Sequence, residues 1–127
     1  MTAQPTVIIA DDDNDIRQLI AVAVRRAGAV LIAEVGNGTD ALAAVRQSPP
    51  DLTILDVSMP EMSGLEVCRA LRLDPSTSAI RILLLSAAVH PAAIAEGLAA
   101  GADAYLTKPF SPRTLSTQIR DMLPAVT

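Results

Sequence analysis

Residues 52–64 read LTILDVSMPEMSG, and this stretch places a carboxylate directly behind a short apolar run. The run 52–55 shows no alternation of polar and apolar residues, a pattern typical of a strand buried on both faces of a parallel sheet. Asp56 follows at once, so a charge stands where the strand ends. Pro60 locks φ and Gly64 permits a positive φ, so the two residues predict a fixed loop after Asp56. The stretch therefore predicts a core strand that leads into a functional carboxylate.

Four other short apolar runs accompany this strand, and segments with helical periodicity separate all five. The runs occupy residues 6–10, 30–35, 80–85 and 104–106. Repeated strand–helix units predict a parallel sheet with right-handed crossovers and helices on both faces. The expected fold class is therefore α/β, with a doubly wound five-stranded parallel sheet. We expect a single domain over residues 1–127, with its core at about residues 5–124.

Capping residues mark the expected helix boundaries. The first helix is expected between Asp13 and Gly28, with Asp13 or Asn14 as its N-cap. Capping and proline signals place the starts of the later helices at Asn37, Ser63, Pro91 and Ser111–Pro112, and Gly101 is the expected stop of the fourth helix.

The helical periodicity also predicts which side chains face the core. Leu19 in the first helix, and Ile94 and Leu98 in the fourth, are expected to point inward. Cys68 lies on the apolar stripe of the third helix and is interpreted as a core residue. His90 is isolated near a helix start and is interpreted as structural or solvated.

Composition and charge narrow the class of protein. The chain has 127 residues, a net charge of −4 and one cysteine, which excludes an internal disulfide and fits a reducing compartment. The sequence lacks a basic stripe interleaved with aromatic residues, which is the pattern that would indicate direct nucleic-acid binding. The start lacks the pattern of a signal peptide, and no apolar run approaches the roughly 20 residues of a membrane span. We therefore expect a cytoplasmic domain that binds neither nucleic acid nor membrane.

Polar residues follow four of the predicted strands. Asp11 and Asp12 follow the first strand, Asp56 the third, Ser86 the fourth, and Lys108 lies just after the fifth. Ligands of open α/β sheets bind outside the carboxyl ends of the strands, so these side chains are expected to meet in one site. Clustered carboxylates repel one another by about 4 kcal/mol per pair at 4 Å and an effective dielectric near 20, and a hard cation relieves that repulsion. The set indicates phosphoryl transfer to Asp56 with Mg²⁺ or Mn²⁺ as cofactor.

Four motifs together resemble the receiver domain of two-component response regulators, in particular the chemotaxis-regulator-like members. The matching stretches are VIIADDD (7–13), LDVSMPEMSG (55–64), LLLSA (83–87) and GADAYLTKPF (101–110). Each follows or ends its own predicted strand, and the resemblance covers nearly all of residues 5–124. It implies a flavodoxin-like sheet with strand order 2-1-3-4-5.

The resemblance also implies the ligands of the metal ion. Asp56 would be the phosphoryl acceptor, and Asp11 and Asp12 would form the acidic pair, with Asp12 as the more direct ligand. The backbone carbonyl of Ser58 would complete the set, so that Asp11, Asp12, Asp56 and Ser58 hold Mg²⁺ or Mn²⁺.

The remaining site residues are implied in the same way. Ser86 would hydrogen-bond the phosphoryl oxygen and Lys108 would pair with the phosphoryl group. Tyr105 matches the aromatic switch position and would respond together with Ser86. A cis peptide is implied before Pro109.

The expected function is a phosphorylation-dependent signalling switch. A sensor histidine kinase or a histidine phosphotransfer protein would supply the phosphoryl group. The face formed by the fourth helix, fifth strand and fifth helix would then change to control a downstream protein partner. Self-phosphorylation and self-dephosphorylation are the only reactions expected, so the protein is not an enzyme in the turnover sense, and it is expected to be a monomer or weak dimer.

Three alternatives stay open from the sequence. The chain can be a receiver domain cut from a larger response regulator or hybrid kinase, a small phosphatase with an aspartate nucleophile, or an interaction module that has lost its chemistry.

Two local features of the sequence predict further properties. The segment 87–102 is almost uncharged, which predicts an apolar partner surface. Ser58 and Ala88 flank the acceptor and neither can position an attacking water, which predicts slow self-dephosphorylation.

Overall fold

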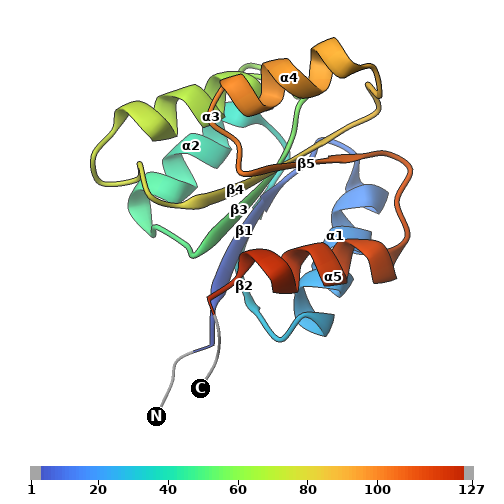
Figure 1. Ribbon diagram of the computed structural model, residues 1–127. Helices are drawn as coiled ribbons and strands as arrows, with labels where there is room; N and C mark the ends of the chain where they lie inside the picture. The colour runs from blue at the N-terminus through green and yellow to red at the C-terminus, as the bar shows by residue number, and fades with distance from the viewer. Residues whose placement is uncertain (1–3, 125–127) are drawn as a thin grey trace.

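A computed structural model describes residues 4–124, which form one sheet flanked by helices (Figure 1). The elements follow one another as β1 (Thr6–Ala10), α1 (Asn14–Arg26), β2 (Val30–Val35), α2 (Gly38–Gln47), β3 (Leu52–Asp56), α3 (Gly64–Leu73), β4 (Arg81–Ser86), α4 (Pro91–Ala99), β5 (Ala104–Thr107) and α5 (Pro112–Met122). The strands are parallel and lie in the order β2-β1-β3-β4-β5, which confirms the predicted topology.

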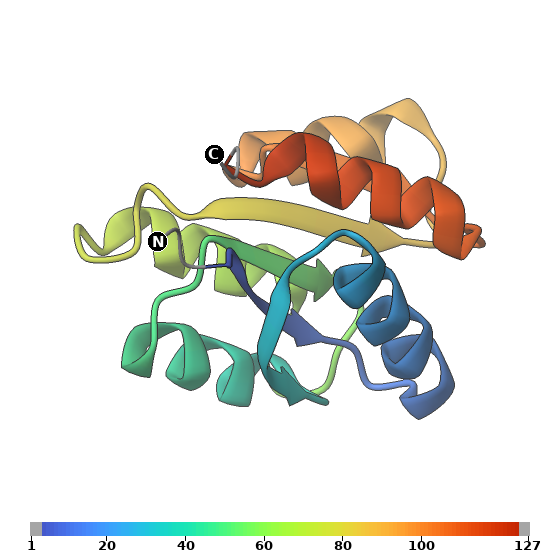
Figure 2. The same cartoon turned by 90° about the horizontal axis from the view of Figure 1, so that it is seen from below.

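Helices cover both faces of the sheet. Figures 1 and 2 show α1 and α5 against one face and α2, α3 and α4 against the other. The core divides accordingly into two apolar layers, because successive strand residues point to opposite faces. Ile9 and Ile54 pack into the layer under α1 and α5, whereas Ile8 and Leu55 pack into the layer under α2 and α3. The alternation of side chains along buried strands explains why apolar runs without polar breaks form the centre of this sheet.

Strand β2 forms one border of the sheet and is less regular than the central strands. Its residues alternate between exposed and half-buried, whereas every residue of β3 is buried. The pairing with β1 shifts register: Val7 pairs with Leu31 and Ile8 with Ala33, so Ile32 is an extra residue in β2. Such an insertion is a β-bulge.

The capping signals give the helix starts correctly. Asp13 is the N-cap of α1 and accepts hydrogen bonds from the backbone N–H groups of Asp15 and Ile16. Ser63 and Glu66 form a reciprocal capping box at the start of α3. The other predicted starts are also confirmed: Asn37 and Ser111 are N-caps, and Pro91 and Pro112 open α4 and α5.

Glycines follow two helix ends in the left-handed region. Gly28 has a φ of +84° and Gly101 a φ of +112°, the conformation that glycine adopts most readily after a helix.

Three strands extend one residue beyond the predicted run, so Asp56 and Ser86 are the last residues of β3 and β4 rather than the first residues of loops. Thr107 likewise ends β5.

Two predicted inward side chains are in fact substantially exposed. Leu19 is 42% exposed and Leu98 is 46% exposed, while Ile94 is half-buried. In α1 the buried stripe runs through Ile20 and Val24, which leaves Leu19 at its border. In α4 almost all residues are apolar, so periodicity does not identify the contact face. Along α4, all of which the structure describes, Gly97 is the one buried residue.

Over residues 4–124, the structure has no helix with the length and apolar character that a membrane crossing requires.

Candidate functional site

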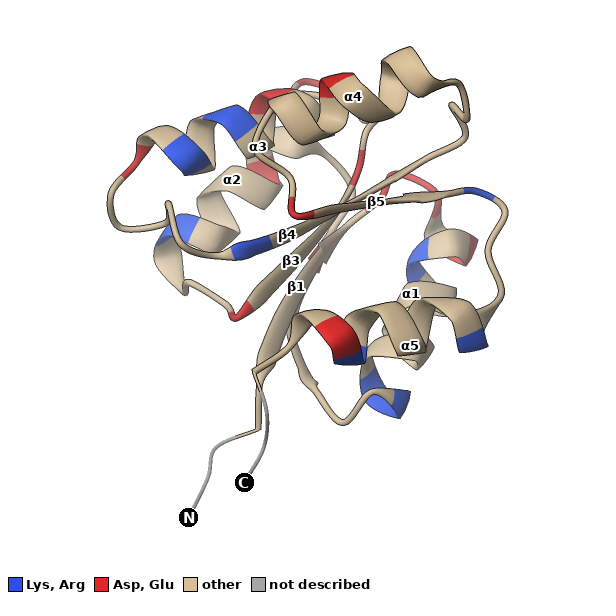
Figure 3. Cartoon of the chain, in the orientation of Figure 1, with Lys and Arg blue, Asp and Glu red and all other residues tan. Residues whose placement is uncertain are grey.

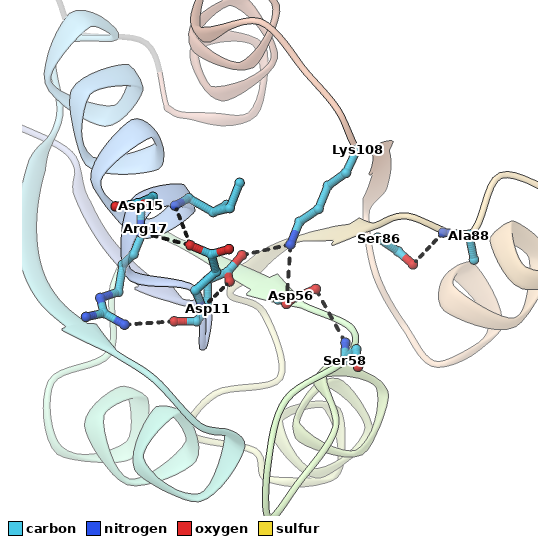
Figure 4. Close-up of polar contacts among 10 residues, drawn as sticks. Asp11, Asp15, Arg17, Asp56, Ser58, Ser86, Ala88 and Lys108 are labelled. Atoms are coloured by element: carbon cyan, nitrogen blue, oxygen red, sulfur yellow. Dashed lines mark hydrogen bonds and ion pairs between the residues drawn. The ribbon is translucent and has the colours of Figure 1, made fainter.

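The carboxyl ends of β1, β3, β4 and β5 meet at one edge of the sheet and form an open hollow of about 460 Å³. Figure 4 shows the side chains that converge there. The hollow is lined by residues from four loops and strand ends, namely Asp11, Asp12, Asp13, Asp56, Ser58, Ser86, Ala87, Ala88 and Lys108. All five side chains that the sequence placed in one site are therefore brought together.

Three carboxylates gather on one side of this hollow. Asp11 and Asp56 are buried and Asp12 is exposed, and one carboxylate oxygen from each lies within 4.8 Å of the others. Asp11 is held in place because its Oδ1 accepts a hydrogen bond of 2.9 Å from the N–H of Asp13. Hard oxygen donors at this spacing fit a divalent cation such as Mg²⁺ or Mn²⁺.

Lys108 bridges the two buried carboxylates from the end of β5. Its Nζ lies 2.9 Å from Oδ2 of Asp11 and 3.3 Å from Oδ2 of Asp56. Burial by itself lowers the pKa of the ammonium group, but the hydrogen bond to Asp11 and the charges of Asp56 and Asp11 outweigh it, so the pKa of Lys108 is raised. The side chain therefore carries a fixed positive charge at the centre of the site.

Asp56 is the carboxylate whose protonation is most altered by its surroundings. Its pKa is raised from 3.8 to about 6, first because burial removes water and second because the charge of Asp11 repels it. The charge and hydrogen bond of Lys108, and the N–H of Ser58, act in the opposite direction without cancelling the rise. The ionised form of Asp56 is thus costly here, and additional positive charge would relieve that cost.

The loop after Asp56 is shaped by close backbone contacts. The Ser58 N–H donates to Oδ1 of Asp56 at 3.4 Å, which places the Ser58 backbone beside the carboxylate. The carbonyl of Pro60 accepts hydrogen bonds from the N–H groups of Met62 (2.8 Å) and Gly38 (3.3 Å), which tie the loop to the start of α2.

Gly64 is required for a different reason from the one predicted. Its φ is not positive, and the positive φ in this loop belongs to Glu61, at 69°. A Cβ on Gly64 would lie 2.3 Å from the carbonyl oxygen of Asp56, so the start of α3 packs against the β3 backbone at a distance that only glycine allows.

Ser86 and Tyr105 meet at the backbone of Ala88. The Ser86 Oγ accepts a hydrogen bond of 3.1 Å from the Ala88 N–H. The Tyr105 hydroxyl donates to the Ala88 carbonyl at 2.9 Å. One residue of the β4–α4 loop therefore connects the predicted phosphoryl-binding serine to the predicted aromatic switch. The peptide between Lys108 and Pro109 is cis.

Arg17 is a site residue that sequence reasoning missed. Its Nη1 donates to the backbone carbonyl of Asp11 at 2.9 Å, and its Nε pairs with Glu34 at 3.1 Å. The guanidinium thus fixes the loop that carries the acidic pair. In the sequence, Arg17 is marked only by its position four residues after the N-cap of α1. That position does not show that the β1–α1 loop folds back so that the Asp11 carbonyl faces the guanidinium.

Comparison with known proteins places this geometry in context. The sequence profile described as "Response regulator receiver domain" matches residues 7–120. The chain is 38% identical over 122 residues to the DNA-binding response regulator MtrA of Mycobacterium tuberculosis, covering 96% of this chain and 52% of the relative. It is 41% identical over 118 residues to the phosphate regulon transcriptional regulatory protein PhoB of Pseudomonas aeruginosa, covering 93% of this chain and 51% of the relative.

A solved structure shows the same fold. The chemotaxis response regulator CheY4 of Vibrio cholerae superposes with a TM-score of 0.88 at 33% identity, covering 95% of this chain and 100% of that one. The chain spans about half the length of the curated relatives it matches, and the full length of the CheY4 chain in that structure.

Proposed function

Because the chain belongs to the response regulator receiver domain family, we propose that it is a signalling switch in which Asp56 accepts a phosphoryl group. The observation that carries this proposal is the position of Lys108, whose ammonium lies between the buried carboxylates of Asp11 and Asp56. The ammonium of Lys108 is held beside the carboxylate of Asp56, where it is suited to stabilise a phosphoryl group during its transfer.

The proposed transfer forms a bond between phosphorus and an Asp56 carboxylate oxygen and breaks the bond between phosphorus and a histidine nitrogen of the donor. The electron pair of the broken bond stays on that nitrogen. Asp56 attacks in its ionised form, so no proton has to leave the carboxyl group at neutral pH. A divalent ion held by Asp11, Asp12, Asp56 and the Ser58 carbonyl supplies positive charge for the phosphoryl oxygens when it is bound.

Two side chains of the hollow are suited to sense the product. An aspartyl phosphate carries extra negative charge and strong acceptor oxygens, which attract the ammonium of Lys108 and the hydroxyl of Ser86. Movement of Ser86 would loosen its hydrogen bond from the Ala88 N–H, and the Ala88 carbonyl also holds Tyr105. We infer that phosphorylation reaches the face of α4, β5 and α5 through this residue.

The proposed partners follow from the family. The phosphoryl donor is a sensor histidine kinase or a histidine phosphotransfer protein in the cytoplasm, and the output is a protein that binds the face of α4, β5 and α5. Figure 3 shows α4 almost without charged residues, which suits an apolar contact. The relatives named above, a DNA-binding response regulator and a transcriptional regulatory protein, are about twice as long, so the same switch can also operate as the receiver part of a longer regulator.

The test is phosphorylation by a small-molecule phosphodonor in the presence of Mg²⁺, followed by intact-mass measurement. We expect one added phosphoryl group on the wild-type chain and none on Asp56→Asn. Asp74→Asn, which alters a half-buried aspartate just after the end of α3 and outside the residues that line the hollow, is the matched control and is expected to be labelled like the wild type. Equal labelling of Asp56→Asn and the wild type would remove Asp56 from the acceptor role.

A further inference from the structure

Helix α4 rests on the sheet at one glycine. Gly97 lies above Tyr105 of β5 and Leu84 of β4, where a Cβ would stand 2.8 Å from Cδ2 and 3.1 Å from Cε2 of the tyrosine ring, and 3.1 Å from Cδ1 of Leu84. Real Cβ atoms essentially never approach a neighbour within 3.0 Å. The absence of a side chain at this position is therefore what lets the ring lie directly beneath the helix.

The two ends of α4 are held in different ways. At the C-terminal end, Arg72 of α3 donates to the Gly101 carbonyl at 2.8 Å and pairs with Asp103 at 2.9 Å. At the N-terminal end, the β4–α4 loop is tied to the rest of the site through the Tyr105 hydroxyl, which donates to the Ala88 carbonyl. The same tyrosine thus supports the last turn of the helix, at Gly97, with its ring and holds the loop before the helix with its hydroxyl.

We propose that Gly97 is a positioning residue of the switch, which couples the placement of α4 to the orientation of the Tyr105 ring. With no Cβ at position 97, the ring occupies the space under the helix while its hydroxyl stays on Ala88. Any shift of the ring leaves the helix without its support, and any shift of the helix changes the space open to the ring. The regulatory part of this inference rests on the proposed function, whereas the contact itself does not.

The composition of the chain provides a direct probe. Tyr105 is the single tyrosine and the sequence has no tryptophan, so tyrosine fluorescence reports this ring alone. We expect Gly97→Ala to displace the ring and to increase quenching of its emission by acrylamide, with Gly97→Ser giving a larger increase. Ala95→Ser, a change of one atom at an exposed neighbouring position of α4, is the control and is expected to leave the quenching unchanged.

Stability gives a second readout in which the sign of the effect is diagnostic. Alanine is the better helix former, so without a clash Gly97→Ala shifts the unfolding equilibrium toward the folded state by about fivefold. We expect that stabilisation in a Tyr105→Ala background, where the two ring contacts are gone and Leu84 Cδ1, at 3.1 Å, has to give by only a few tenths of an ångström. In the wild-type background we expect Gly97→Ala to shift the equilibrium toward the unfolded state instead. A purely local preference for glycine would give the same sign in both backgrounds.

Phosphorylation separates this inference from the proposed function. Adding a phosphodonor and Mg²⁺ is expected to change Tyr105 quenching in the wild type and to leave it nearly constant in Gly97→Ala, while intact mass shows the same labelling of both. Unchanged quenching in Gly97→Ala without phosphodonor, or stabilisation in both backgrounds, overturns the role of Gly97. Absence of labelling in every variant counts against the proposed function and leaves the quenching and stability results to decide on Gly97.

Discussion

Lys108 at the end of β5 holds Asp11 at the end of β1 across the width of two intervening strands, with Nζ 2.9 Å from Oδ2. This ion pair joins residues 97 positions apart in the sequence. It places a protein cation where a metal ion would also be attracted, so Lys108 and a divalent ion compete for the same negative charge.

Removal of Lys108 is expected to strengthen metal binding. In Lys108→Met the carboxylates of Asp11 and Asp56 lose their protein cation, and the repulsion between them increases the benefit of a bound ion. We expect the affinity for Mg²⁺ to rise by about tenfold, a modest share of the Coulomb energy of charges at this separation. Titration calorimetry measures it. Arg113→Met, which removes an exposed cation from α5, is the control, and a weaker affinity in Lys108→Met would contradict the expectation.

Neutralising Asp56 is expected to stabilise the metal-free protein in a pH-dependent way. The folded-state pKa of Asp56 is raised from 3.8 to about 6, so the folded protein binds the proton more tightly than the unfolded chain. Stability therefore falls as pH rises through this window, by up to about 3 kcal/mol above pH 6. Asp56→Asn avoids that loss, so its advantage in urea unfolding is expected to be full at pH 7 and absent below about pH 4.

The control for this experiment has the opposite sign. Hydrogen bonds from Ser76 lower the pKa of Asp74, which is half-buried. Its contribution to stability is present above its unfolded-state pKa and is lost as pH falls, so Asp74→Asn is expected to remove stability at neutral pH. A gain in Asp56→Asn that does not depend on pH would show that burial of the ionised carboxylate is not its cause.

Ser58 is expected to determine how long the phosphoryl group stays on Asp56. Its hydroxyl is too short to position a water for attack on phosphorus, whereas the amide of asparagine, whose polar atoms lie one bond further from the backbone, can orient one. Ser58→Asn is therefore expected to shorten the lifetime of the aspartyl phosphate by about tenfold, the effect of about 1.4 kcal/mol in the barrier. The decay of the phosphorylated mass measures it. Ser76→Asn serves as control, and an unchanged lifetime in Ser58→Asn speaks against the role of this position.

A buried hydroxyl in β3 offers a stabilising substitution. Among the residues that the structure describes, Thr53 Oγ1 is the buried side-chain polar atom without a hydrogen-bond partner. Replacing it with the isosteric valine removes the cost of an unsatisfied group, so Thr53→Val is expected to stabilise the protein by about 1 kcal/mol. Thr77→Val is the matched control, because the Thr77 hydroxyl donates to the Leu71 carbonyl at 2.8 Å and its loss is expected to destabilise. The free energies of unfolding in urea test both signs.

The strand ends and the helix caps were predictable from the sequence for physical reasons. Parallel strands bring their carboxyl ends to one edge, so Asp56, Ser86 and Lys108 could be placed together from their positions after apolar runs. Caps such as Asp13 and Ser63 act on backbone groups two or three residues away, so local sequence is enough to find them.

Other features could not be predicted because they depend on how the elements meet in space. The inward face of α4 could not be identified from residues that are nearly all apolar, and Leu98 was placed on the wrong side. The hydrogen bond from Tyr105 to Ala88 involves a backbone carbonyl, which leaves no mark in the sequence. Gly64 was assigned a positive φ, whereas its contact with the Asp56 carbonyl arises from the packing of α3 on β3.

The extra residue Ile32 in β2 bears on how the protein behaves at high concentration. A straight border strand presents unpaired N–H and C=O groups to other chains and can recruit them into fibrils. An insertion of this kind bends the strand that carries it, and the ion pair of Glu34 with Arg17 places charged side chains at the same strand. Deletion of Ile32 would restore a regular border strand, and we expect the protein to become less soluble and to aggregate at high concentration.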